Sequence, residues 1–310
     1  MFVTVTANPS VDRTIEVDRL ARGELHRATR TQVHPGGKGV NVARALVRNG
    51  VKARAVVPVG GAEGTQLVAL LTEYSVDVVR VPTAGAVRCN ISVIEPDGTV
   101  TKLNEAGPPL TGDDSVAIRD AVLSVVSDAE GVVLAGSLPP GAPDDFYADL
   151  IGRLRGVGVD IAVDTSGPAF LAAVKAGPAL VKPNLHELEE AAGRELPTLG
   201  DVIAASRELR EQGAGAVLAS LGGRGAVLVD GNGVWHADAP AEVRCTVGAG
   251  DALLAGFLSA GGKGPDALGE AVAWGAAAVS LPGSTMPGAT DIKGRVARID
   301  ARPDPARSTR

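Results

Sequence analysis

The sequence has few residues of several types, and each scarcity excludes a class of protein. Its 310 residues include only two cysteines, Cys89 and Cys245, so no disulfide framework holds the chain together. Both cysteines are predicted to be small buried apolar side chains. The four histidines are scattered, and neither H-E-x-x-H nor C-x-x-C occurs, which argues against a zinc site.

Aromatic residues and positive charge are also scarce. Only eight residues are aromatic, and the net charge is −6, so the chain lacks the basic field and the stacking platforms that nucleic-acid binding favours. No apolar run reaches the ~18 residues of a membrane span, and residues 271–281 are interrupted by Gly275 and Ser280. The start of the chain does not resemble a signal peptide. We therefore expect a cytoplasmic protein with neither nucleic acid nor membrane as its partner.

Three widespread site motifs are missing. The sequence contains no G-x-x-x-x-G-K-[ST] phosphate loop and no G-x-S-x-G nucleophile elbow. The pair Gly248 and Gly250 begins a G-x-G, but the third glycine is absent and the pair lies far from the first strand, so a dinucleotide site is not expected.

Glycine, in contrast, is abundant, with 40 residues that show no G-X-Y period. Short apolar runs alternate with helical patterns along most of the chain, which predicts an α/β fold with a mostly parallel sheet and helices on both faces. The expected strands are 2–7, 54–59, 131–136, 160–164, 179–182 and 216–220, and the expected helices are 38–49, 64–74, 143–155, 167–175, 185–193 and 198–212.

Two segments break this rhythm. Residues 12–34 alternate polar and apolar side chains, and residues 86–104 form a hairpin pattern with Pro96-Asp97-Gly98 at the turn. We expect them to form a small β-sheet lid, and the remaining segments (1–11, 35–85 and 105–310) to form the core. The tail after Arg302 is predicted to be frayed.

The most informative motif is Thr246-Val247-Gly248-Ala249-Gly250-Asp251, followed by an apolar helix. Glycines before a helix let successive N–H groups point at one spot, and the helix dipole adds positive potential, so Gly248, Ala249 and Gly250 predict an anion site. Asp251 in the first turn is placed to take a proton from a hydroxyl beside that anion. The simpler alternative is a helix cap.

A second glycine-rich stretch, Pro35 to Asn41, precedes another helix and allows backbone to approach a ligand closely. Gly37, Lys38 and Asn41 are its candidate binding residues. Asp12 follows the first strand, where ligands of open α/β sheets bind, although a turn-forming role is the alternative. Arg88 and Asn90 share one face of the predicted lid.

Three further segments lie next to predicted strands. Lys182-Pro183-Asn184 leads into a helix whose Glu187 suits either a capping box with Asn184 or a water-mediated contact to phosphate-bound Mg²⁺. The other two segments suit anion contacts or plain turns; they are Ser220-Leu221-Gly222-Gly223-Arg224-Gly225 and Gly136-Ser137-Leu138-Pro139-Pro140.

Taken together, these motifs resemble the pfkB/ribokinase family of sugar kinases over nearly the whole chain. The two most specific matches are PGGKGVNVARAL (35–46) and TVGAGDALLAGF (246–257). NPSVD, RCN, TKLNEAGP, GSLPPG, LVKPNLHELE and SLGGRGA resemble the branch that phosphorylates ketohexose phosphates, nearest to the enzymes acting on fructose 1-phosphate. The fold implied is ribokinase-like.

The resemblance implies a role for each candidate. Asp251 would be the general base, and the amides of residues 248–250 would hold the transferred phosphoryl. The remaining roles are implied in groups: nucleotide contacts for Lys182, Asn184, Ser220, Gly222, Gly225, Gly250 and Ala276; Mg²⁺ for Asn184 and Glu187; sugar phosphate for Asp12, Gly37, Lys38, Asn41, Arg88, Asn90, Ser137, Asn104 and Glu105. Arg27, in the segment 12–34, is a further candidate for contact with the phosphate. It is assigned neither to the site of its own chain nor to the site of a neighbouring subunit.

The expected activity is transfer of phosphate from ATP to fructose 1-phosphate with Mg²⁺, giving fructose 1,6-bisphosphate. Tagatose 6-phosphate and fructose 6-phosphate are alternative acceptors, although kinases of the last type tend to carry glycine where this chain has Lys38. A non-catalytic sugar-phosphate sensor is the alternative from another class. Three cations, Lys38, Arg88 and Lys182, are predicted to attract the phosphates. The lid predicts a homodimer in which lids pack together.

Overall fold

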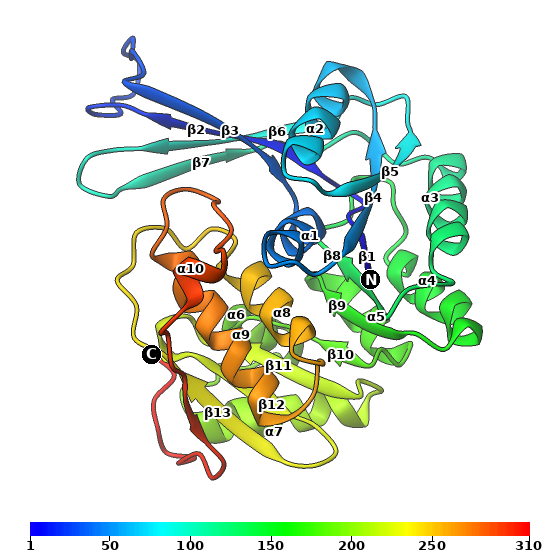
Figure 1. Cartoon of the computed structure of the whole chain (residues 1–310), viewed down its shortest axis with the longest axis vertical. Coiled ribbons are helices and arrows are strands. Elements are labelled where there is room, and N and C mark those ends of the chain that lie inside the picture. The colour runs from blue at the N-terminus through cyan, green and yellow to red at the C-terminus, as the bar shows by residue number, and fades with distance from the viewer.

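The computed structural model describes all residues from 1 to 310, and one large sheet organises it (Figure 1). The strand order is β14-β13-β12-β11-β10-β9-β8-β1-β4-β5. The strands from β5 to β11 in this order are parallel, and β12, β13 and β14 continue the sheet antiparallel. Their bounds are β1 (Phe2–Val5), β4 (Ala53–Val59), β5 (Asp77–Pro82), β8 (Gly131–Ala135), β9 (Asp160–Asp164), β10 (Leu180–Val181), β11 (Ala216–Ser220), β12 (Ala226–Val229), β13 (Val234–Asp238) and β14 (Arg298–Asp300).

Helices cover both faces of this sheet, as the alternation of patterns predicts. Neighbouring residues of one strand enter opposite cores: Val132 and Leu134 pack with one set of helices, Val133 and Ala135 with the other. The first set is α3 (Gly112–Val125), α4 (Phe146–Leu154), α5 (Gly167–Lys175), α6 (Leu185–Ala192) and α7 (Leu199–Glu211); the second is α1 (Lys38–Arg48), α2 (Gly61–Glu73), α8 (Ala249–Ser259) and α9 (Gly264–Val279). Short elements complete the chain: α10 (Ala289–Ile292) and the 3₁₀ turns Arg155–Val157 and Gly222–Arg224.

The two segments that break the α/β rhythm form a separate four-stranded sheet, as expected. Its order is β3-β2-β6-β7, with bounds β2 (Ser10–Glu16), β3 (Arg30–Gly36), β6 (Arg88–Ile94) and β7 (Val100–Asn104). The two central strands are parallel and the outer pairs antiparallel. This sheet, the lid, projects away from the α/β body on the side of α1 and α2 (Figure 1).

Two expectations are wrong. The tail does not fray: the Thr309 side chain is buried and donates to the Leu196 carbonyl (2.8 Å), and Arg310 pairs with Glu189 (2.9 Å), because residues 196–198 present free backbone groups to it. The cysteines are free, but both are partly exposed rather than buried, because Cys89 lies on a lid strand and Cys245 on the loop before α8.

No helix of the structure is both long enough and apolar enough to span a bilayer.

Candidate active site

The candidate residues gather where the parallel strands end. Because β10, β9, β8 and β1 are adjacent and parallel, their carboxyl ends share one edge of the sheet. Asp164 ends β9, Lys182 follows β10, Gly136 follows β8 and Asn8 follows β1. The amino ends of α1 and α8 meet the same edge.

Helix α8 presents Asp251 in its first turn. Gly248 is the N-cap, and its φ of 79° favours glycine; a Cβ there would also displace the Met286 methyl group. The first N–H groups of a helix have no intrahelical acceptor. The Ala249 N–H contacts the Thr246 carbonyl at 3.4 Å, and those of Gly250 and Asp251 are left for a ligand. Asp251 is 7% exposed as a residue, and its carboxylate accepts a hydrogen bond from Asn41 Nδ2 at 2.8 Å.

Burial changes the protonation of this carboxyl group. It raises the pKa of Asp251 to about 6, and the negative charge of Asp164 adds to the rise. The Asn41 hydrogen bond and the charges of Lys38 and Lys182 oppose it. A carboxylate with a raised pKa and one polar partner is suited to accept a proton near neutral pH.

Two lysines share one buried carboxylate beside this helix. Asp164 is fully buried and contacts Lys38 Nζ at 2.7 Å and Lys182 Nζ at 3.0 Å. Burial alone would raise the pKa of Asp164, but Lys182 and Lys38 outweigh that effect and hold the pKa below its usual value. Our sequence reasoning missed Asp164, although it ends a buried strand, the same signal that singled out Asp12.

Lys38 has a second acidic partner, Glu187, at 3.0 Å. Burial alone would lower the pKa of Lys38, but the charges of Asp164 and Glu187 outweigh burial and raise it. Lys38 therefore faces the α/β body, where it joins β9 to α6.

The capping box expected at α6 is present. Glu187 N–H donates to Asn184 Oδ1 at 2.9 Å, and Asn184 N–H donates to Glu187 Oε2 at 2.8 Å. Both carboxylate oxygens of Glu187 are engaged, Oε2 in the cap and Oε1 with Lys38 Nζ.

Lys182 lies over the start of α8. A Cβ on Gly250 would sit 3.4 Å from Lys182 Nζ, so the ammonium group and the free N–H groups of the helix face the same space. This combination is an anion site of the kind that the glycine motif predicts.

The charge balance of the cluster bears on a metal ion. Lys38 and Lys182 stand against three carboxylates, those of Asp164, Asp251 and Glu187, which leaves one negative charge. No three acidic, histidine or cysteine side chains lie together as a ready metal cage. The carboxylates are oxygen ligands, which suit Mg²⁺ that keeps most of its water better than a metal held by a full protein cage.

A second group of candidates meets at the base of the lid. Asp12 Oδ1 accepts hydrogen bonds from Asn90 Nδ2 (2.9 Å) and from Ser10 Oγ (2.6 Å). A Cβ on Gly36 would overlap the Asp12 carboxylate, which explains this glycine. Gly37, with φ of 115°, then caps α1 and delivers Lys38 to the sheet edge.

Arg88 connects the lid to the α/β body through two hydrogen bonds. Its Nη1 donates to the Glu105 carbonyl (3.0 Å) and its Nη2 to the Asn8 carbonyl (3.1 Å), while its buried Nε has no partner. The Glu105 carboxylate accepts from Cys89 N–H, and Asn104 pairs with Asn90 across the lid. Arg88 thus ties the lid to β1, with N–H groups left over.

The remaining candidates have fewer contacts to these groups. Ser137 is exposed just after β8, and Ser220 pairs with Asn184 across two strand ends. A Cβ on Gly225 would collide with the Ala237 carbonyl, so sheet packing alone requires that glycine. Gly222 is exposed, Ala276 is buried on α9, and Arg27 lies in the exposed loop between β2 and β3.

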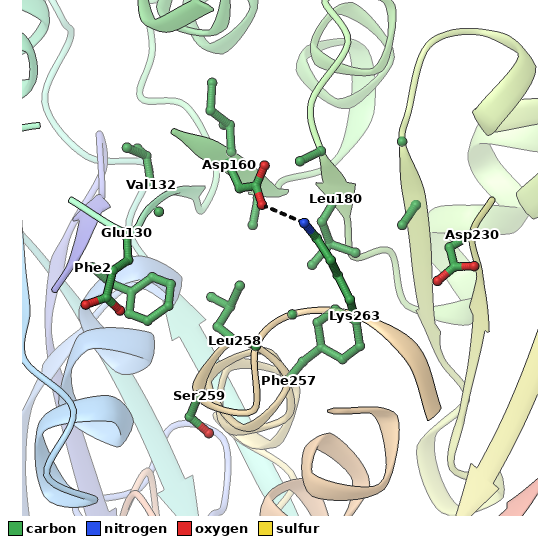
Figure 2. A pocket seen from close by; sticks show the side chains of 18 of the residues that line it. Phe2, Glu130, Val132, Asp160, Leu180, Asp230, Phe257, Leu258, Ser259 and Lys263 are labelled. Atoms are coloured by element: carbon green, nitrogen blue, oxygen red, sulfur yellow. Dashed lines mark ion pairs between the residues drawn. The ribbon is translucent and has the colours of Figure 1, made fainter. Parts of the chain in front are cut away.

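A sizeable cavity of the molecule lies elsewhere (Figure 2). It measures about 640 Å³ at the amino ends of the parallel strands, with apolar walls that include Phe2 and Leu180. A surface ion pair between Lys263 and Asp160, 3.3 Å long, crosses it, and none of the candidate residues lines it. The candidate residues therefore lie at the carboxyl ends of the strands, where open α/β sheets bind ligands, and not at this cavity.

Comparison with known proteins shows the family of the chain. Residues 5–290 match the model of the pfkB family carbohydrate kinases, and the chain belongs to that family. Such kinases are phosphotransferases acting on carbohydrate. Among curated relatives, 1-phosphofructokinase of Escherichia coli K12 is 36% identical over 308 residues, covering 97% of both chains. That of Bacillus subtilis is 35% identical over 260 residues, covering 84% of this chain and 85% of its own.

Solved structures share the fold as well. Phosphofructokinase-2 of Escherichia coli in complex with potassium superposes with a TM-score of 0.89 at 33% identity, covering 94% of this chain and 96% of its own. Arabidopsis thaliana ribokinase, at 23% identity and a TM-score of 0.73, covers 94% and 96% and supports the fold alone. The ribokinase-like fold expected from the motifs is confirmed.

The shared carboxylate gives a first prediction. Asp164→Asn leaves Lys182 buried without its only ion-pair partner, so the free energy of unfolding at pH 7 should fall by about 3 kcal/mol. Urea denaturation measures it. Because the folded-state pKa of Asp164 is lowered, its contribution is present above about pH 3.9 and is lost as the pH falls through the folded value, so the difference between wild type and variant should shrink there.

Asp160→Asn is the matched control. Asp160 begins the same strand, its side chain is 66% exposed, and it also pairs with a lysine. Surface pairs contribute about 1 kcal/mol or less, so this variant should stay near wild type. Equal losses in the two variants would contradict the role given to Asp164.

Proposed function

We propose that this kinase transfers the γ-phosphoryl group of ATP to fructose 1-phosphate and forms fructose 1,6-bisphosphate. The observation that carries the proposal is the buried Asp251 carboxylate at the amino end of α8, beside the Gly250 backbone and the Lys182 ammonium. The relatives named 1-phosphofructokinase support this acceptor.

In this proposal Asp251 is the general base. It takes the proton of the acceptor hydroxyl as that oxygen attacks the γ-phosphorus and the bond to the ADP oxygen breaks. The amides of Gly248, Ala249 and Gly250 hold the charge of the moving phosphoryl group. Positioning and charge stabilisation are the main demands of this chemistry, and one carboxylate beside an anion site meets both.

Nucleotide binding is assigned to the ends of β10 and β11. Lys182 would contact the phosphates, and Ser220, Gly222 and Gly225 would line the phosphate chain. Adenine is assigned to the region of Ala276 and its small neighbours on α9, which packs against the start of α8 through Gly275.

Mg²⁺ is proposed to come with the nucleotide. Asn184 and Glu187 would hold it through water, and Asp164 lies behind them with Lys38. The Mg²⁺ ion would neutralise negative charge on the phosphates. The cluster of two lysines and three carboxylates cannot do this, because its own net charge is negative.

The sugar phosphate is assigned to the base of the lid. Asp12, Asn90 and Gly37 would contact hydroxyl groups, and Asn104 and Glu105 would close the rim. The free N–H groups of Arg88 would bind the phosphate that the sugar already carries, with Ser137 beside the sheet edge. Lys38 and Asn41 are assigned here too, although in the structure their side chains contact Asp164 and Asp251.

The test of the function is ADP release with three acceptors at equal concentration: fructose 1-phosphate, fructose 6-phosphate and tagatose 6-phosphate. We expect kcat/KM to be highest for fructose 1-phosphate. A higher value for either 6-phosphate assigns the enzyme to that substrate, and no ADP release with any of them supports a non-catalytic sensor.

The role of Asp251 gives a separate prediction. Asp251→Asn keeps the shape and the Asn41 contact but removes the base, so kcat should fall by ~10²–10⁴-fold with an unchanged melting temperature. Asp160→Asn is again the matched control and should keep wild-type kcat. A D251N variant that retains most of its turnover would remove Asp251 from this role.

The quaternary structure is part of the proposal. One face of the lid carries Ile15, Ile91 and Leu103 together with Arg13, and Leu103 is 60% exposed. We assign this mostly apolar face to contact with the lid of a second copy, giving a homodimer. A tetrameric form is known for Escherichia coli phosphofructokinase-2.

Light scattering at micromolar concentration tests the dimer. The wild type should show twice the 31.2 kDa mass of one chain, and Leu103→Lys should shift it toward the monomer, because a charge would be buried without a partner. Val100→Lys, on the same strand but the opposite face, is the control and should remain dimeric. A monomeric wild type would overturn the assignment.

A further inference from the structure

Arg44 is a buried charge that the proposed chemistry does not use. Its side chain lies inside the protein, with the residue 3% exposed, yet no carboxylate lies within ion-pair distance of it. Buried arginines are normally paired, because an unpaired charge loses its hydration without compensation. The uncharged partners of this guanidinium group therefore require an explanation.

Those partners are three. Arg44 Nη1 donates to Asn41 Oδ1 at 2.9 Å and to the Pro35 carbonyl at 3.2 Å, and the guanidinium lies 4.5 Å from the centre of the Tyr74 ring. The ring face supplies a cation–π contact that partly replaces water. The Tyr74 hydroxyl in turn lies 3.1 Å from His34 Nδ1, which fixes the ring. Asn41, Pro35 and Tyr74 together hold the Arg44 guanidinium in place.

The contact with Asn41 fixes which way its amide points. A guanidinium group has no acceptor, so only the amide oxygen of Asn41 can face it. The NH₂ end is then directed to the opposite side, where it donates to Asp251 Oδ2 at 2.8 Å. A reversed amide would place its oxygen against the Asp251 carboxylate and its NH₂ against the Arg44 cation, and both contacts would repel.

Helix geometry allows this chain of contacts. Lys38, Asn41 and Arg44 follow one another at intervals of three residues on α1, so successive members of this polar row lie close enough to interact, and Asn41 in the middle contacts α8. The row reaches Asp164 through Lys38 and Asp251 through Asn41.

We propose that Arg44 is a positioning residue for Asp251, acting through Asn41, whose amide it holds with the NH₂ group directed at the catalytic carboxylate. This inference rests on the proposed role of Asp251 as the base. It adds that Asn41 serves the base before any sugar binds, and that the orientation of the carboxylate depends on a cation two hydrogen bonds away.

The test is a double-mutant cycle in the full-length enzyme, with kcat and the KM for the sugar phosphate as readouts. Arg44→Met keeps the length and removes the donor, so kcat should fall by about 10- to 100-fold, with KM within about twofold. Asn41→Ala should also lower kcat. If Arg44 acts through Asn41, adding Arg44→Met to Asn41→Ala should change kcat by less than about twofold.

Two further variants make the result specific. Arg44→Lys keeps a charged donor and should recover part of the kcat lost in Arg44→Met. Arg48→Met removes an arginine one turn along the same helix, whose side chain is 47% exposed, and should leave kcat unchanged. If Arg44→Met does not fold, Arg44→Lys in both backgrounds completes the cycle.

Effects of Arg44→Met and Asn41→Ala that multiply would overturn the proposal, as would wild-type kcat in Arg44→Met. These failures are distinct from failure of the proposed function. If Asp251→Asn is inactive and the effects of Arg44→Met and Asn41→Ala multiply, Asp251 keeps its role as the base and the positioning role of Arg44 is rejected. If Asp251→Asn is active, the role of Asp251 as the base is rejected.

Discussion

The site depends on keeping two buried carboxylates, those of Asp164 and Asp251, next to each other at one edge of the sheet. Like charges in a poorly solvated place repel, and burial penalises each of them further. Lys38 and Lys182 make the arrangement tolerable because both contact Asp164 directly. They leave Asp251 with one neutral partner, Asn41. Asp164 is therefore fixed in its charged form, and Asp251 is the member of the pair that can take up a proton.

The different environments of Asp164 and Asp251 follow from several features of the fold. The parallel order β10-β9-β8-β1 brings the ends of four strands to one edge, and α1 and α8 start there. Helix α1 supplies Lys38 and Asn41 from one face, and β10 delivers Lys182 beside Gly250. The anion site and the acid–base group then occupy adjacent space, where both can meet one phosphoryl group.

Much of this arrangement could be predicted from the sequence, because local patterns carry it. The apolar runs gave the parallel strands, the alternation in two segments gave the lid, and the glycines before Asp251 marked a helix start with free N–H groups. Asn184 and Glu187 form the capping box that their spacing predicts.

Contacts between distant segments could not be predicted in this way. Lys38 and Asp164 are 126 residues apart, and no local pattern indicates that a lysine in a glycine-rich loop pairs with the end of β9. Arg44 looked like an ordinary helix residue, because only the fold brings Tyr74 and Pro35 around it. The docked tail escaped prediction for the same reason: its partners are backbone groups at residues 196 and 197.

The central claim is that folding alone holds Asp251 as a buried carboxyl group ready to accept a proton. The direct measurement is the titration of that carboxyl group in the ligand-free enzyme by ¹³C NMR, with Asp251→Asn identifying the signal. Without bound phosphates, no ligand group titrates in the same range. The account predicts a pKa of about 6. A value near 3.9, that of an exposed aspartate, would contradict it.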